Sequence, residues 1–410
     1  MRVLGIESSC DETAAAVVED GYKLLSNVVH TQIDIHAQYG GVVPEVAARS
    51  HIEVINPVIN QALADAGCTW DDIDAIAVTY APGLIGSLLV GTLAARTLAI
   101  VHSKPLYAIH HVEAHVYANF IVEKSSPALS SHSLTSSEET SAARGSSGAE
   151  ARLETRSEAV SGDDGSERAA MKDNGLSNLA LPSKQPEFPM LALIVSGGHS
   201  QLVLFRDHGD YELLGQTQDD AVGEAFDKVA KIIGLPYPGG PSVAKAALNG
   251  DPYKYKLPKA KLDNPYNFSF SGLKTALLRA VQHEVDKDYT FPSHELPALL
   301  NDAQRNDFAA SFQQIAVETL VDKAEKAFHN FSPASVVIAG GVAANQELRR
   351  QLSERLPIEI EYAPIQLCTD NAAMIATLGY YAAQKIDPVD PYELEVVPSL
   401  SMTKTAWAAI

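Results

Sequence analysis

Hydrophobic residues form short runs separated by small polar turns at two places in the chain. The first place, residues 1–27, reads MRVLGIESSCDETAAAVVEDGYKLLSN: an apolar strand, a small polar turn, a second strand, a turn with glycine and a third strand. The second place, residues 189–216, reads PMLALIVSGGHSQLVLFRDHGDYELLGQ and repeats that order. Both segments predict β-meanders whose first hairpin turn consists of small residues. Alternating helical and strand patterns follow each meander, which predicts mixed α/β layers.

This repeated order predicts the fold class. Two strand–turn–strand units, each leading into α/β structure, are typical of the duplicated actin-like ATPase fold, in which two lobes enclose a central cleft. In that fold the two turns face each other across the cleft and hold nucleotide phosphates. The alternative is a chance similarity between two hairpins, and the pattern alone leaves it open.

Residues 124–186 separate the two repeats and differ from them in composition. They include fifteen serines and no Phe, Tyr or Trp, so they cannot bury enough apolar surface to offset the entropy of ordering. We therefore expect a disordered insertion in a surface loop. The remaining organisation is a first lobe at 1–123, a second lobe at 187–385 and a tail at 386–410 that packs back or is disordered.

The formal net charge of −20 limits the partners that the chain can bind by itself. Such a protein repels nucleic acid at long range unless it has a local basic patch or a basic partner. The chain starts without a secretory signal pattern, and polar residues interrupt the apolar stretch at 83–100. Its three cysteines have no disulfide or metal spacing. We expect a cytoplasmic protein with no membrane span.

The segment His111-Val112-Glu113-Ala114-His115 places two imidazoles four residues apart. On a helix their side chains lie within roughly 40° of each other, which is suitable for a transition metal. A polar face or a core pair is the alternative. Glu113 falls on the opposite face of the helix, whereas a zinc protease has its Glu next to the first His, as H-E-x-x-H. The spacing therefore argues against the protease mechanism.

Asp370, in the segment Cys368-Thr369-Asp370-Asn371, comes just before the last clear helical pattern. It is either a helix cap, a role for which Thr369 and Asn371 compete, or a metal carboxylate. As a carboxylate it would complete a set with His111 and His115. Two imidazoles and one carboxylate leave coordination positions open and suit Fe²⁺ or Zn²⁺.

Glycine-rich segments supply further candidates, each with a plain structural alternative. Ser196–Ser200 follows a strand at Leu191–Val195, and its backbone N–H groups can approach an anion, although Gly-Gly is also common in hairpin turns. Pro238–Ser242 reads as a rigid turn after a helix at Gly223–Ile233. In that helix Asp227 binds a sugar hydroxyl or belongs to a solvated face.

Two further segments join a turn to a helix. Ala339–Asn345 follows a strand at Ser335–Ile338, and its Asn345 serves as a ligand contact or as a helix cap. The segment Asn267–Thr275 is a substrate loop or a capped helix start with an exposed Lys274.

Taken together, these segments resemble the TsaD family, which includes the catalytic subunit of the tRNA threonylcarbamoyladenosine transferase. The resemblance covers 1–123 and 187–385 and is closest to the bacterial branch. Nine motifs occur in the family's order: GIESSCDET, YGGVVPEVAARSH, APGLIGSLLVG, HHVEAH, LIVSGGHSQLV, GEAFDKVAKIIGLPYPGGP, FSFSGLK, AGGVAAN and CTDNAAMIA.

The resemblance implies a function. Threonylcarbamoyl would move from threonylcarbamoyl-AMP to N6 of adenosine 37 in tRNAs that read codons beginning with A, and AMP would leave. The metal would be Fe²⁺, held by His111, His115 and Asp370. The implied partners are tRNA, a paralogous actin-like subunit and a small P-loop ATPase. The implied substrate residues are Val195, Ser196, Gly197, Gly198 and His199, with Asp227, Gly240 and Asn345 at the nucleoside.

Two catalytic roles are hypotheses within this resemblance. Asp11 orients the substrate or a metal-bound water, and His199 assists proton transfer. Backbone N–H groups at Gly197–Gly198 and Gly340–Gly341 stabilise developing anionic charge. The chain departs from many relatives in its serine-rich insertion and in its tail, which lacks their basic end. We therefore expect the assembly to grip tRNA, with Arg49, Lys228, Lys231 and Lys274 as local candidates.

Three alternatives compete with this interpretation. A metal-dependent glycoprotease is disfavoured by the position of Glu113. An actin-like metabolite kinase would hold Mg²⁺ with carboxylates and waters rather than with histidines. A scaffold without enzymatic activity would lack the metal set, which this chain retains.

Overall fold

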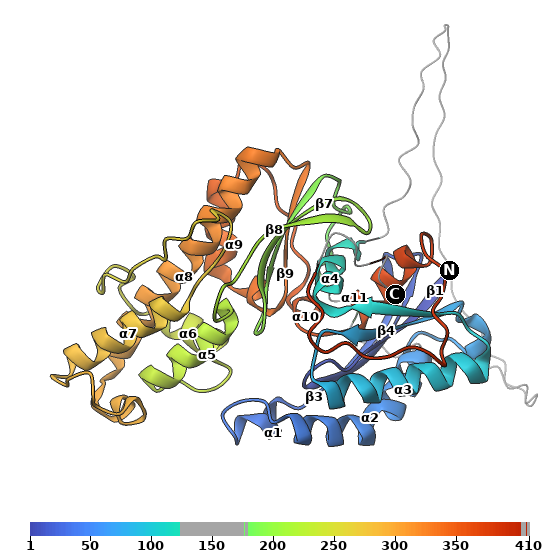
Figure 1. Cartoon of the computed structure of the whole chain (residues 1–410), viewed down its shortest axis with the longest axis horizontal. Coiled ribbons are helices and arrows are strands. Elements are labelled where there is room, and N and C mark those ends of the chain that lie inside the picture. Colours follow the sequence, from blue (N-terminus) through green and yellow to red (C-terminus); the bar gives the residue numbers. More distant parts are fainter. Residues whose placement is uncertain (124–175, 177–178, 403–406, 408–410) are drawn as a thin grey trace, which may run out of the picture.

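The computed structural model of the chain describes residues 1–123, 176, 179–402 and 407 and contains two mixed sheets (Figure 1). Most of the predicted insertion at 124–186 lies outside the described residues. The first sheet has the order β3 (Lys23–Thr31), β2 (Glu12–Glu19), β1 (Arg2–Glu7), β4 (Ala75–Ala81) and β5 (Leu106–His110). The second has the order β8 (Asp210–Gln216), β7 (Ser200–Asp207), β6 (Met190–Val195) and β9 (Ser335–Ala339).

The two sheets repeat one topology. Each begins with three antiparallel strands, and its first strand then pairs in parallel with a later one, β4 or β9. The predicted meanders and their duplication are therefore confirmed. Strands β1, β4 and β6 are buried almost throughout, as expected for strands covered on both faces.

Helices cover the sheets on both sides. In the first half, α2 and α3 pack on one face of the first sheet, and α4 follows β5 directly and contacts β6 and β9. In the second half, α8 contacts β6, and α5, α6, α7 and α9 pack on α8. The helices are α1 (Ile33–Ala37), α2 (Pro44–Asp65), α3 (Ile85–His102), α4 (His111–Tyr117), α5 (Val222–Ile233), α6 (Gly239–Ala247), α7 (Ser271–Glu284), α8 (Asp302–Phe331), α9 (Gln346–Arg355), α10 (Ile365–Cys368) and α11 (Ala372–Ala382).

Helix α11 crosses from the second half of the chain to the first sheet. Although it lies within the predicted segment 187–385, it packs against β1, β2 and β4. Two glycines permit the close approach: a Cβ on Gly5 would lie 2.3 Å from the Ala372 carbonyl oxygen, and one on Gly379 would lie 2.4 Å from the Ala77 Cβ. The residues just before α11 are thereby brought next to the end of β5.

The predicted rigid turn at Pro238–Ser242 is wrong, because α6 begins at Gly239. The backbone N–H of Gly239 donates a 2.6 Å hydrogen bond to Oδ1 of Asp227, which lies in the middle of the preceding helix. Pro241 lies in the first turn of α6, where proline is tolerated because its missing N–H has no helical partner anyway.

Aromatic rings join the two halves beside α4. His208, in the turn between β7 and β8, stacks on Tyr381 of α11 with ring centroids 3.8 Å apart. Its Nδ1 lies 3.1 Å from the hydroxyl of Tyr117. Phe120 and Phe188 pack around the same imidazole. The turn of the second sheet is therefore held against helices that pack on the first.

This imidazole predicts acid sensitivity. Burial lowers the pKa of His208 from 6.5 to about 4; Asp207 opposes the shift and Lys385 adds to it. Because the unfolded state then binds a proton more tightly, the free energy of unfolding falls as the pH drops below 6.5, by about 2 kcal/mol at pH 5. Denaturant unfolding at pH 7 and pH 5 measures this loss. His208→Gln should reduce it, whereas His294→Gln, at an exposed histidine, should not; equal losses in all three proteins would contradict the prediction.

Candidate metal centre

Helix α4 begins immediately after strand β5 and is buried along its whole length. His110 is its N-cap, and its Nδ1 accepts a 3.4 Å hydrogen bond from the backbone N–H of Glu113. The next turn brings the rings of His111 and His115 together, with centroids 4.7 Å apart. The two imidazoles lie on one face of the helix, as their spacing predicts.

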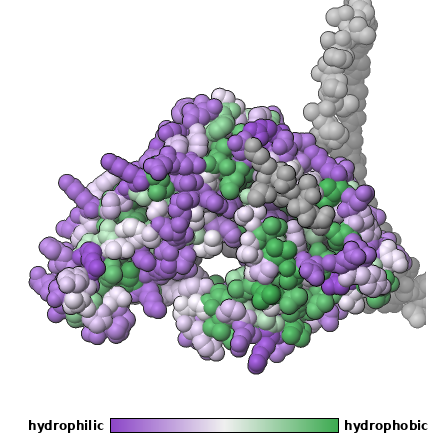
Figure 2. Space-filling view, viewed as in Figure 1, coloured by the Kyte–Doolittle hydropathy of each residue, from purple (hydrophilic) through white to green (hydrophobic). Residues whose placement is uncertain are grey.

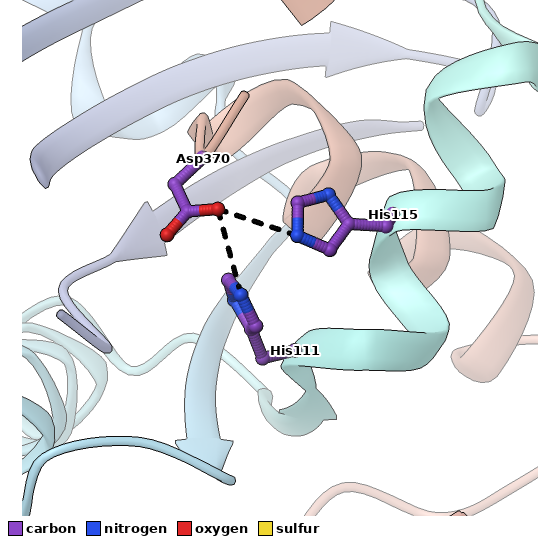
Figure 3. Close-up of side chains that lie close together, drawn as sticks. All are labelled: His111, His115 and Asp370. Atoms are coloured by element: carbon purple, nitrogen blue, oxygen red, sulfur yellow. Dashed lines mark ion pairs between the residues drawn. The ribbon is translucent and has the colours of Figure 1, made fainter. Parts of the chain in front are cut away.

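Asp370 reaches the two imidazoles from the loop between α10 and α11 (Figure 3). Its Oδ1 lies 3.5 Å from His111 Nε2 and 3.3 Å from His115 Nε2. The helix cap is Asn371, whose side chain accepts a hydrogen bond from the Met374 N–H. Asn371 rather than Asp370 is therefore the helix cap, and the Asp370 carboxylate contacts the two histidines.

The donor set fits a transition metal. One ligand atom from each of the three residues lies within 4.8 Å of the other two. Both ring nitrogens of His115 are buried without a hydrogen bond among the described residues, which is costly unless another partner binds them. Two imidazole nitrogens and one carboxylate oxygen suit Fe²⁺ or Zn²⁺ and leave coordination positions for a substrate.

Glu7 supports the first histidine from behind. Its fully buried carboxylate lies 3.1 Å from His111 Nδ1 and accepts short hydrogen bonds from the Thr79 hydroxyl and the Ser9 N–H. A carboxylate on the second ring nitrogen fixes the orientation of a ligand histidine and makes it a better donor. This role of Glu7 was not predicted from the sequence. The available signal was a lone carboxylate at the end of the apolar strand RVLGIE.

The site concentrates opposing charges. Burial disfavours a protonated His111, but Asp370 and Glu7 together outweigh it and raise its pKa to about 9. Burial also disfavours an ionised Asp370, yet His111 and His115 hold the pKa of that carboxyl well below its usual range. Burial, then Asp370 and Asp11, raise the pKa of Glu12 to about 10. Glu12, the first residue of β2, is therefore close enough to Asp370 for the two carboxyls to disfavour each other's ionisation.

The second hairpin turn faces the same set. Burial, with the nearby His111 and His115 adding to the shift, lowers the pKa of His199 to about 4. A Cβ built on Gly197 or Gly198 meets nothing within 4 Å, so the backbone there borders open space. The His199 N–H donates to Ser196 Oγ, and the Ser196 N–H donates to the His199 carbonyl, which fix the turn. Val195, at the end of β6, is fully buried behind it.

The turn that follows β9 and begins at Gly340 lies beside this hairpin. Gly340 has a φ of +88°, and a Cβ on it would lie 2.5 Å from the Val195 carbonyl oxygen, so only glycine fits. Asn345 then caps α9 by accepting from the Leu348 N–H, and its Nδ2 donates to Gln313. The cap interpretation of Asn345 is confirmed, and its amide keeps one N–H and one lone pair for a ligand.

The remaining predicted residues lie on two sides of a cleft: Asp11 belongs to the first half, and Asp227 and Gly240 belong to the second. Tyr237 lies between them: burial raises its pKa to about 12, with Asp11 of the first half and Asp227 of the second half adding to the shift. Gly240 borders open space. Figure 2 shows the surface hollowed between the part that carries α5 and α6 and the part that carries α2 and α3.

Glu113 points away from the ligand set. Its carboxylate accepts hydrogen bonds from Trp407 Nε1 at 2.7 Å and from the Tyr211 hydroxyl at 3.3 Å. Burial raises its pKa to about 8, and both donors oppose that shift. The helical spacing predicts that Glu113 lies on the opposite face of the helix, but neither partner is predictable, because both are far away in the sequence.

These observations define a class. Two sheets of one topology, two small-residue turns and a buried His–His–carboxylate set between them describe a duplicated α/β protein with a metal centre at the junction of its halves.

Comparison with known proteins identifies the family. The TsaD family, described as tRNA N6-adenosine threonylcarbamoyltransferase, matches residues 23–163 and 174–377. The chain is 45% identical over 396 residues to the enzyme of that name from Thermomicrobium roseum, covering 94% of this chain and 93% of that protein. It is 46% identical over 382 residues to the one from Symbiobacterium thermophilum, covering 92% and 91%. The chain belongs to the TsaD family and is a transferase.

The fold is a duplicated α/β arrangement with two mixed sheets of one topology. Among solved structures, component A of the (R)-2-hydroxyglutaryl-CoA dehydratase of Acidaminococcus fermentans has a TM-score of 0.43 and 12% identity, covering 94% of this chain and all of that one. The ROK hexokinase of Thermus thermophilus has a TM-score of 0.40 and 15% identity, covering 94% and 100%. Both TM-scores are below 0.5, and the predicted duplicated α/β architecture is confirmed by the repeated sheet topology itself.

Glu7 provides a test of the centre. Glu7→Gln keeps the shape but removes the charge that orients His111, so we expect metal affinity to fall by about tenfold. Calorimetric titration with Zn²⁺ and with Co²⁺ measures the dissociation constant. Glu53→Gln, at an exposed position of α2, is the matched control. Equal affinities of the two variants would show that Glu7 does not support the metal.

Proposed function

We propose that the chain transfers a threonylcarbamoyl group from threonylcarbamoyl-AMP to N6 of adenosine 37 in tRNAs that read codons beginning with A, with release of AMP. Membership of the TsaD family supports transfer to tRNA. The observation that carries the proposal is the ligand set of His111, His115 and Asp370 beside the turn at Ser196–His199. We propose Fe²⁺ as the metal, with Zn²⁺ as the alternative, and the cytoplasm as the location.

The reaction makes a C–N bond and breaks the bond between the carbonyl carbon and the phosphate oxygen. An exocyclic adenine amine is a weak nucleophile, so the carbonyl needs polarisation and the leaving phosphate needs neutralisation. A metal on the ligand set supplies Lewis acidity for both. The remaining work, which is to hold the two substrates and remove one N6 proton, falls to the side chains and backbone around the set.

The turn at Ser196–His199 is suited to bind the carbonyl group of the threonylcarbamoyl donor. Its glycines border open space, and backbone N–H groups there can donate to developing negative charge. With a pKa of about 4, His199 is neutral at pH 7, and its unprotonated ring nitrogen is a weak base. We assign it the removal of the N6 proton, and we assign Asp11 the orientation of the acyl donor.

We assign binding of the nucleoside to residues in the second half of the molecule. Asp227, Gly240 and Asn345 lie on the α5, α6 and α9 side of the cleft. The Asp227 carboxylate accepts from the Gly239 N–H through one oxygen, so its other oxygen remains for a ribose hydroxyl.

The protease alternative finds no support in the geometry. The general base of an H-E-x-x-H protease must face the metal, whereas the Glu113 carboxylate is bound to Trp407 and Tyr211. The kinase alternative needs Mg²⁺ held by carboxylates and waters, which the two imidazoles do not favour.

The transfer reaction is tested with labelled threonine. The mixture contains this chain, ATP, bicarbonate, a threonylcarbamoyl-AMP synthase, the two partner proteins and an unmodified tRNA that reads an A-starting codon. We expect label in the tRNA with the native chain and at least a hundredfold less with His111→Ala/His115→Ala. His294→Ala/His329→Ala, at two exposed histidines, is the matched control. No label with the native chain, while a family member works in the same mixture, would refute the proposal.

The charge of the chain supports an assembly. Lys228 and Lys274 are both close to Asp220, so they contribute little free positive charge. Arg49 and Lys231 form no ion pair within the part of the chain that the structure describes. We propose that tRNA is held jointly with a paralogous actin-like subunit and a small P-loop ATPase.

Helix α3 supplies an apolar surface for the paralogous subunit. It is long and apolar enough to cross a membrane, and a third of it is buried against the protein. It packs on α2 and β4. Figure 2 shows hydrophobic residues gathered on this face. The exposed apolar side chains of α3 are Ile85, Leu89, Leu93, Ile100 and Val101. A patch of this kind marks an interaction site.

A charge on this patch tests the assembly. Leu93→Asp puts a carboxylate where the side chain is 53% exposed, so we expect at least tenfold weaker binding of the paralogous subunit. Leu248→Asp, at a leucine that is 83% exposed on the other half, is the control. Analytical ultracentrifugation with the purified subunit gives both affinities. If both variants bind like the native chain, the partner docks elsewhere.

A further inference from the structure

The C-terminal segment returns to the metal helix. After α11 the chain follows the first half, where the Val397 N–H donates to the Tyr80 carbonyl and the Gly83 N–H donates to the Pro398 carbonyl. The Arg96 guanidinium donates to three carbonyls of this segment. His110, the residue that caps α4, contacts the Leu400 carbonyl through Nε2 at 3.2 Å. Leu400 is thereby held beside the start of α4.

Trp407 inserts its ring beside α4. Its Nε1 donates a 2.7 Å hydrogen bond to Glu113 Oε1, and the second carboxylate oxygen accepts from the Tyr211 hydroxyl of β8. The ring lies over Gly209 in the turn between β7 and β8, where a Cβ would come within 2.6 Å of it. The cavity that it shares with Glu113 is also lined by Tyr80 and Leu378. One indole therefore contacts both halves of the molecule.

Glu113 links the Trp407 ring to the helix that carries His111 and His115. It lies two residues after His111 and two residues before His115, on the other face of the same helix. The helix has only seven residues, so packing rather than its own hydrogen bonds must fix its rotation. A buried carboxyl group also needs its partners, since an unsatisfied one is costly. Without the indole N–H, Glu113 keeps only the longer contact with Tyr211.

We propose that Trp407 is a positioning residue for the metal centre: through Glu113 it sets the rotation of α4 and thereby holds the two imidazoles toward Asp370. Because coupling between two sites is reciprocal, metal binding must also seat the Trp407 ring more firmly. This inference concerns metal binding and does not depend on which group the enzyme transfers.

The chain has two tryptophans, Trp70 and Trp407, which makes the reciprocal effect measurable. In Trp70→Phe the only indole is Trp407. Zn²⁺, which does not quench fluorescence, should shift the emission of Trp407 to shorter wavelength and lower its quenching by acrylamide. The transition should saturate at the zinc dissociation constant found by calorimetry and vanish in Trp70→Phe/His111→Ala/His115→Ala. Unchanged emission on saturation with zinc would refute the coupling.

The forward effect is measured with Trp407→Phe, which keeps a ring but removes the N–H donor. We expect Zn²⁺ and Co²⁺ to bind about tenfold more weakly than in Trp70→Phe, the matched control, while circular dichroism stays unchanged. Glu113→Gln keeps a carbonyl acceptor for the indole and should bind metal like the native chain. A lower melting temperature of Trp407→Phe with unchanged metal affinity would assign Trp407 a structural role only. Because the emission experiment leaves Trp407 in place, it decides the matter even if Trp407→Phe does not fold.

Discussion

The structure depends on a carboxylate that is held between two imidazoles at the junction of the two halves. Asp370 belongs to the second half of the sequence, whereas His111 and His115 follow the last strand of the first sheet. A carboxylate in such surroundings is stable only with positive charge next to it, which protonated histidines or a metal cation supply. The contact therefore ties the halves together and defines where chemistry can occur.

Several features of the fold serve this one contact. Helix α11 must pack on the first sheet to bring Asp370 to the histidines, and Gly5 and Gly379 make room for it. Asn371 caps the helix, which releases Asp370 from that role. Glu7 lies behind His111 and adds a second negative charge. These residues are distant in the sequence, but each of them helps to position the Asp370 carboxylate or the imidazole that it contacts.

Local patterns predicted the parts of the site but not their support. The two meanders follow from alternating apolar runs and small turns, and the histidine pair follows from helical periodicity, so both were predictable. The partner of a buried group is a tertiary property. The contacts of Glu7 with His111 and of Glu113 with Trp407 join residues 104 and 294 positions apart, and no local periodicity reports them. The start of α6 was not predicted for a related reason. The Gly239 N–H at the start of this helix donates to the Asp227 carboxylate, a contact that the Pro-Gly-Gly-Pro segment alone does not reveal.

The position of one glutamate separates this centre from that of a zinc protease. In H-E-x-x-H the carboxylate lies next to the first histidine and faces the metal, where it activates water. In His111-Val112-Glu113-Ala114-His115 it lies midway between the ligands, which turns it to the far face of α4. There it contacts Trp407 and Tyr211 rather than a substrate. With no carboxylate from α4 aimed at the open coordination positions, water gains no base from this helix. The groups near the ligand set come instead from the hairpin turns that border the cleft.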